Sequence, residues 1–174
     1  MRPQISHINS YLPSSVVGNA EIENQVNSRG VILPPNSIER LFGIKERRYA
    51  SDGQQTSDLA AIAAMPIVEA IGRENIDCLI FGSACSDLLE PATANIVQQK
   101  LGLQCPVFDI KNACNSFVNA IQVASAFVES GVYKRVLVVN GEILHHAIQL
   151  HPNRVKTWRG AWPLLPLVMP GQLP

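Results

Sequence analysis

Cys114 has the most distinctive chemical setting in this sequence, within the stretch Asp109-Ile-Lys-Asn-Ala-Cys-Asn-Ser-Phe. An apolar strand is predicted to end just before it, and Cys114 is predicted to fall in the first turn of a buried helix. The free N–H groups and positive dipole end of a helix N-terminus stabilise anions and so favour the thiolate of a cysteine. A thiolate is a nucleophile, and the same N–H groups can hold an oxyanion. The alternative is a small core residue, as most free cysteines are.

Other side chains are weaker candidates for chemistry. Cys78 lies in an apolar strand pattern and is interpreted as a core residue, whereas Cys85, just past that strand, either lines a pocket or packs. The four cysteines contain no C-x-x-C pair, and His145-His146 after Glu142 does not form H-E-x-x-H. A metal site, a disulfide framework and a bound cofactor are therefore not expected, and no glycine-rich nucleotide motif occurs.

The composition narrows the class of protein. The chain has 174 residues, 47% of them apolar, with 14 basic and 14 acidic side chains. A neutral chain of this kind predicts a globular protein rather than a nucleic-acid binder. No apolar run reaches the length of a membrane span, and the N-terminus has no apolar signal stretch. We therefore expect a cytoplasmic protein without nucleic-acid or membrane partners.

Alternating strands and helices are expected to position Cys114. Buried-strand patterns occupy residues 76–84, 105–110 and 135–141, and helical patterns occupy residues 56–71, 91–102 and 114–130. Pro66 is expected to kink or interrupt the first of these helices. The helix 114–130 is apolar almost all round and is predicted to be buried. This order predicts a layered α/β architecture.

The two ends of the chain differ from this pattern. Residues 5–17 predict a short strand and a turn, Asn19 is a candidate helix N-cap, and Ser37 is a candidate cap of a short helix ending at Gly43. Residues 152–174 hold five of the twelve prolines, both tryptophans and no acidic residue. We therefore expect one α/β unit over residues 1–150 and an irregular tail over residues 151–174.

Several stretches together resemble the β-ketoacyl-acyl-carrier-protein synthase III family of the thiolase superfamily. They occur in the family's order and spacing over residues 5–145, which resemble its N-terminal half only. The matching stretches are Ser10-Tyr-Leu-Pro, Phe42-Gly-Ile-Lys-Glu-Arg-Arg, Thr56-Ser-Asp-Leu-Ala-Ala-Ile-Ala-Ala, Pro91-Ala-Thr-Ala, Leu101-Gly, Phe108-Asp, Ala113-Cys-Asn-Ser-Phe, Ser130-Gly and Val136-Leu-Val-Val-Asn-Gly-Glu.

The resemblance implies a fold and a reaction. The fold would be a thiolase-like layered α-β-α arrangement, half of the family's five-layer α-β-α-β-α sandwich, and the protein would be a homodimer. Cys114 would accept an acyl group from acyl-CoA or an acyl carrier protein. A malonyl-type thioester would then lose carbon dioxide and attack the acyl group, which gives a β-keto thioester in fatty-acid or related biosynthesis.

The resemblance also implies roles for residues outside the cysteine motif. Well-known members grip CoA through a Trp and an Arg, whose positions are held here by Ser37 and Leu41, so a carrier-protein donor or other CoA contacts are expected. Lys45, Arg47 and Arg48 are candidates for binding a phosphate or an acidic carrier, with a solvated charge cluster as the alternative. Phe117 is a weak candidate for substrate binding.

Glu90 resembles a residue of the branch that joins two acyl chains, where it reaches across the dimer as a pocket residue or base. The alternative is a carboxylate that merely favours a helix N-terminus.

The resemblance stops before the family's second half. That half carries the His and Asn that stabilise the carbanion, and a Gly N–H that completes the oxyanion hole. Read in a shifted frame, the tail can give Phe-(Ser or Gly)-Asp-Ala-Gly-Ala-(Thr or Ala)-Ala, close to the motif expected next. Our hypothesis is a frameshift near residues 151–165, which the nucleotide sequence tests. The alternative function is a catalytically incompetent fragment that exposes apolar surface and acts at most as a dimerising partner.

Overall fold

The computed structural model describes residues 2–28 and 33–144. These residues form two compact units. The core unit consists of residues 2–12 and 53–142, and the hairpin unit consists of residues 13–52 together with residues that follow 142. The chain thus divides within the range 1–150 that the sequence analysis grouped together, and the tail 151–174 lies outside the described residues.

The hairpin unit contains an antiparallel pair of strands, β1 (Ser15–Gly18) and β2 (Glu46–Tyr49), and two helices, α1 (Asn19–Asn27) and α2 (Ser37–Phe42). Within the predicted strand region, regular structure is confined to β1 at its end. Neither predicted cap is correct, because Gly18 is the N-cap of α1 and Asn36 that of α2.

Glu23 has a role in the hairpin unit that its place in the sequence does not reveal. It is only 7% exposed, and its carboxylate accepts the backbone N–H groups of Asn36 at 3.1 Å and Ile38 at 3.2 Å. These are free donors at the start of α2, so the carboxylate caps that helix from α1.

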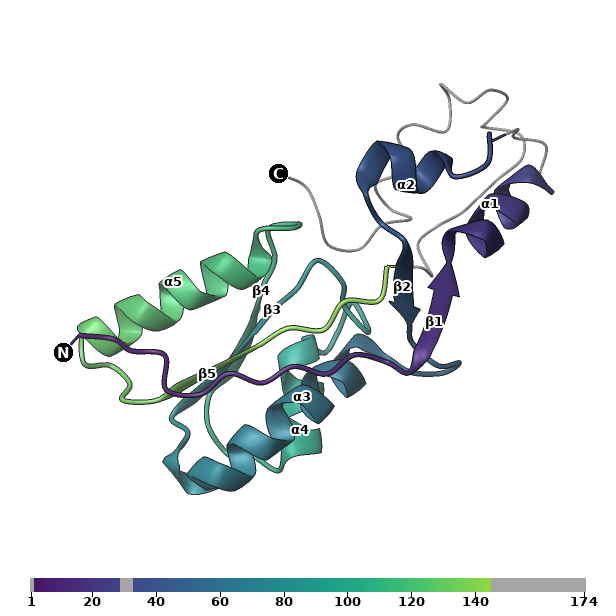
Figure 1. Ribbon diagram of the computed structural model, residues 1–174. Coiled ribbons are helices and arrows are strands. Elements are labelled where there is room, and N and C mark those ends of the chain that lie inside the picture. Colours follow the sequence, from purple (N-terminus) through teal and green to yellow (C-terminus); the bar gives the residue numbers. More distant parts are fainter. Residues whose placement is uncertain (1, 29–32, 145–174) are drawn as a thin grey trace. The chain divides into compact units, whose positions relative to one another are not determined.

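The core unit is built on a three-stranded parallel sheet in the order β4-β3-β5 (Figure 1). Its strands are β4 (Val107–Ile110), β3 (Cys78–Gly82) and β5 (Val136–Val139), which confirms the three predicted strand positions. Helices α3 (Thr56–Ile71) and α4 (Thr93–Leu101) cover one face, and α5 (Ser116–Glu129) covers the other. A short 3-10 helix, η1 (Arg73–Asn75), links α3 to β3.

The strand period explains the two cores of this unit. Successive side chains of a strand point to opposite faces of the sheet. Leu79 and Phe81 of β3 therefore pack in the cluster with α3 and α4, whereas Cys78 and Ile80 pack with α5. All four are essentially inaccessible, at 0 to 1% exposure, so β3 is the centre of the fold.

The helices of the core unit begin and end for identifiable reasons. Gln55 and Asp58 form a reciprocal capping box at the start of α3, and the helix continues through Pro66 to Ile71, so the predicted interruption does not occur. The start of α4 is Thr93, two residues after the predicted Pro91, and the helix ends as predicted at Gly102, whose φ of +67° suits glycine.

The prediction that α5 is buried all round is wrong for the described structure. The helix buries the small residues Ser116, Ala120 and Ala124, whereas Phe117 is 42% exposed and Val118 is 51% exposed. The reason is geometric, because α5 has a sheet to pack against on one side only. Its other apolar side faces outward among the described residues.

Candidate active site

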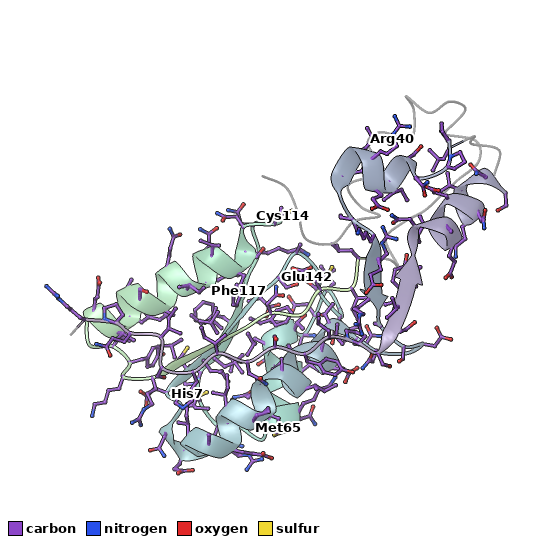
Figure 2. The ribbon with its side chains drawn as sticks, viewed as in Figure 1. His7, Arg40, Met65, Cys114, Phe117 and Glu142 are labelled. Carbon is purple, nitrogen blue, oxygen red and sulfur yellow. The ribbon has the colours of Figure 1, made fainter. Side chains whose placement is uncertain are left out.

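The carboxyl ends of all three parallel strands meet at one edge of the core unit. The register pairs Gly82 with Ile110 and Phe81 with Val139, so the residues that follow β3, β4 and β5 emerge side by side. Ligands in open α/β sheets bind outside this edge. Cys114 follows β4 and lies there, at the N-terminal end of α5 (Figure 2).

Cys114 occupies a tight turn between β4 and α5. It is exposed and lies just before the helix, whose N-cap is Asn115, so the prediction that it belongs to the first helical turn is wrong. Ala113 has a φ of +47°, a left-handed conformation that is strained for a residue with a side chain. The Asn115 N–H donates to the Asn112 carbonyl at 3.0 Å and closes the turn. A strained backbone thus presents an accessible thiol just before the N-terminus of α5.

Ser116 fastens this turn from the inside of the molecule. Ser116 is only 1% exposed. Its Oγ accepts a hydrogen bond from the backbone N–H of Asn112 at 2.8 Å and donates one to the Ala113 carbonyl at 2.7 Å. A buried hydroxyl with both of its roles used holds its neighbours firmly. Sequence reasoning missed Ser116, although a serine following a candidate nucleophile at a helix start is the available signal.

The ends of β3 and β5 are tied together beside this turn. Ser83 Oγ donates to the Gly141 carbonyl at 2.7 Å, and Glu142 Oε1 accepts the Ala84 N–H at 2.8 Å and the Asn140 Nδ2 at 3.2 Å. The second carboxylate oxygen of Glu142 is buried and has no hydrogen-bond partner among the described residues. The sequence pointed to Glu142 only through its place before His145 and His146, which lie outside the described residues.

Glu90 lies on a loop that borders a shallow hollow of about 510 Å³. The hollow is lined by Ser86, Asp87, Leu88, Leu89, Glu90, Ala92, Asp109 and Lys111, and Cys114 is not among these residues. Glu90 is exposed and precedes the cis peptide bond to Pro91. Leu89 on the same loop is 96% exposed, so the loop presents an apolar and an acidic side chain together.

Two carboxylates hold this loop region to the helices. Asp109 accepts the N–H groups of Thr93 at 2.9 Å and Ala94 at 2.7 Å, and so caps α4 from the end of β4. Asp87 accepts the Ser57 N–H at 3.1 Å at the start of α3. Both carboxylates are only partly exposed, and both satisfy free helix N–H groups.

The three basic candidates belong to the hairpin unit and have different settings. Lys45 is well exposed, with an ion pair to Glu39 at 3.9 Å, and Arg48 is also exposed. Arg47 is only 5% exposed, and its guanidinium donates to the Val17 carbonyl and to Asn19 Oδ1. Burial lowers the pKa of Arg47. Arg47 therefore stabilises the hairpin unit and offers little surface to a ligand.

The remaining cysteines differ from Cys114 in access. Cys78 is completely buried, and burial raises its pKa to about 11, which agrees with its interpretation as a core residue. Burial also raises the pKa of Cys105, and Cys85 is half-buried at the same sheet edge as Cys114. Among the described residues, Cys114 is the exposed thiol.

Comparison of the sequence with known proteins identifies the family of the chain. The sequence pattern of the family described as 3-Oxoacyl-[acyl-carrier-protein (ACP)] synthase III matches residues 108–158, a range that contains the Cys114 turn. The chain is also 38% identical to the β-ketoacyl-[acyl-carrier-protein] synthase III of Laribacter hongkongensis, over 83% of this chain and 45% of the relative. The chain belongs to the 3-oxoacyl-[acyl-carrier-protein] synthase III family. It spans less than half the length of the curated relatives it matches.

Solved structures confirm the thiolase-like layered α/β fold of a synthase III family member. The synthase III of Aquifex aeolicus superposes with a TM-score of 0.74 at 31% identity, over 82% of this chain and 46% of that one. Xanthomonas campestris OleA superposes with a TM-score of 0.73 at 31% identity, over 82% of this chain and 44% of that one.

The match to the family's sequence pattern extends to residue 158, past the expected boundary at residue 150. No helix in the described ranges is both long and apolar enough to cross a bilayer.

Proposed function

We propose that this chain is the acyl-accepting part of a 3-oxoacyl-[acyl-carrier-protein] synthase III and that Cys114 is its nucleophile. The observation that carries the proposal is the exposed Cys114 thiol on a strained turn at the carboxyl edge of the sheet, inside the range that matches the family. Thiol access and a preorganised turn are what a nucleophilic cysteine needs.

The proposed reaction has two steps. In the first, the Cys114 thiolate attacks the carbonyl carbon of an acyl-CoA or acyl-carrier-protein thioester, and the thiol carrier leaves and takes up a proton. In the second, a malonyl-type thioester loses its carboxylate as carbon dioxide, and the resulting carbanion attacks the Cys114 thioester. Carbon–carbon bond formation releases the Cys114 thiolate, and the product is a β-keto thioester. No bound cofactor enters either step, because the pantetheine thioester carries the chemistry.

The second step needs groups beyond those described. In the family that the chain resembles, a His, an Asn and a Gly N–H from the other half stabilise the carbanion and the oxyanion. We infer that they are supplied by further sequence or by a separate chain, in a cytoplasmic homodimer. Glu90 is proposed to act across that dimer in the acyl pocket or as a base, and Lys45, Arg48 and Phe117 as weaker substrate contacts.

A second candidate function is that of a fragment that pairs with another chain and does not condense substrates. The exposed Phe117 and Val118 on α5 favour it, because neighbouring apolar side chains exposed on a helix are typical of a surface that binds a partner. The same observation is compatible with the first proposal, so only a chemical test separates the two.

Mass spectrometry after incubation with acyl-CoA provides that test. We expect an acyl adduct on the Cys114 peptide, lost on treatment with hydroxylamine, and no adduct in Cys114→Ser. Folded wild-type protein without an adduct would support the inactive fragment instead. Sequencing the gene beyond residue 150 decides whether a shifted frame continues into synthase-like sequence, and an uninterrupted unrelated frame would refute the frameshift.

A further inference from the structure

A chain of side-chain amides runs along one side of the Cys114 turn. Asn112 donates from Nδ2 to Oδ1 of Asn119 at 2.7 Å, and Asn115 donates from Nδ2 to the same oxygen at 3.3 Å. Asn119 in turn donates from Nδ2 to Oε1 of Gln122 at 2.7 Å. A single oxygen of Asn119 therefore binds the residues on both sides of Ala113 and Cys114.

The turn needs such support because its backbone is strained. Ala113 holds a φ of +47°, which persists only where the surroundings impose it. Ser116 imposes it from the buried side, as described above, whereas Asn119 acts from the exposed side. Asn119 sits in the rigid helix α5, and its own N–H bonds to the Asn115 carbonyl at 3.0 Å, so its side chain has a firm base.

We propose that Asn119 is a positioning residue for Cys114. Its Oδ1 holds Asn112 and Asn115 together, and this keeps the thiol aimed for attack on an acyl carbonyl. The inference rests on the proposed function of Cys114 as acyl acceptor. It assigns Asn119 no contact with the substrate. Small errors in the placement of a reacting group cost large factors in rate, so loss of this contact affects acylation before it affects folding.

The test measures acylation of Cys114 by decanoyl-CoA as a function of its concentration, by peptide mass spectrometry. In Asn119→Ala we expect the maximal acylation rate to fall roughly tenfold, with the half-saturating concentration changed less than about twofold. Asn112→Ala, which removes the 2.7 Å donor without altering the helix, should show the same loss.

Two further variants separate positioning from general damage. Asn119→Asp keeps the acceptor oxygen, so it should recover most of the rate. Gln122→Ala removes only the outer bond and should acylate like the wild type. Alkylation of Cys114 by iodoacetamide needs only an accessible thiolate and should change less than about threefold in all of them.

The outcomes distinguish the two claims. A folded wild type that takes up no acyl group contradicts the proposed function of Cys114 itself. If the wild type is acylated, but Asn119→Ala and Asn112→Ala are acylated just as fast, only the role of Asn119 is contradicted. An equal loss in Gln122→Ala, or no recovery in Asn119→Asp, also contradicts it, since the shared oxygen would then not be the cause. Cys78 is completely buried, so a variant in which iodoacetamide leaves Cys78 unmodified is folded.

Discussion

Gly82 and Ala120 meet where β3 crosses α5, and a Cβ placed on Gly82 would lie 2.7 Å from the Cβ of Ala120. It would also lie 2.9 Å from the carbonyl oxygen of Ser116, which belongs to the backbone and cannot rotate away. The sheet therefore touches the first turns of α5 directly. Because Ser116 fastens the Cys114 turn, we expect crowding at Gly82 to displace the thiol.

We expect Gly82→Ala to push α5 outward and lower the free energy of unfolding by about 1–3 kcal/mol, as overpacking does. It should also slow acylation of Cys114 more than it slows alkylation by iodoacetamide. Urea unfolding and peptide mass spectrometry measure the two effects. Gly18→Ala is the matched control, because nothing lies within 4 Å of its added Cβ, and it should lose only the roughly 0.5 kcal/mol by which alanine is worse than glycine as the N-cap of α1. If Gly82→Ala unfolds at the same urea concentration as Gly18→Ala, α5 moves aside without cost and the prediction is wrong.

Asp109→Ala removes the cap of α4. We expect a loss of about 1–2 kcal/mol in the free energy of unfolding, because the Thr93 and Ala94 N–H groups lose their acceptor. Asp52→Ala, at an exposed loop position, serves as the control for removing a carboxylate. A loss in Asp52→Ala as large as in Asp109→Ala would contradict the capping role.

Asp58 makes a pH-dependent contribution to stability. A hydrogen bond from Lys100 at 2.6 Å and one from the Gln55 backbone hold the pKa of Asp58 below its ordinary value. A carboxyl whose pKa is lowered in the folded state contributes stability that is present above its unfolded pKa and is lost as the pH falls through the folded pKa. The difference in urea midpoint between wild type and Asp58→Asn should thus be constant at neutral pH and shrink below a pH of about 4. A difference that persists unchanged in more acidic solution would refute the ionic contribution.

Cys78 and Cys114 should differ sharply in reactivity. Burial raises the pKa of Cys78 to about 11, so at pH 8 it is almost entirely protonated as well as inaccessible. Iodoacetamide should modify Cys114 within minutes and leave Cys78 untouched until urea unfolds the chain. Quantitative peptide mass spectrometry follows both sites in one sample. Modification of Cys78 at a comparable rate in native buffer would mean that the core unit opens readily.

Local patterns in the sequence were sufficient to predict much of the architecture and to single out Cys114 as the candidate nucleophile. The three strands of the core unit and its helices have distinct apolar periods and end at glycines or polar residues, so their order and approximate bounds were predictable. Cys114 stood out because a reactive thiol depends on a local junction of strand and helix. The family resemblance rested on short motifs of the same local kind.

Contacts between residues far apart in the chain were decided only by the tertiary structure. Glu23 caps a helix that begins after a proline break, Asp109 caps α4 from a neighbouring strand, and Arg47 is buried against Val17. A charged side chain in a sequence carries no sign of which distant backbone group it will meet, so the sequence did not reveal these roles. The one-sided burial of α5 is of the same type, since periodicity shows that a helix is apolar but not how many of its sides a sheet covers. The sequence alone therefore determined the elements and the thiol, and the packing of the sheet determined which side chains hold that thiol in place.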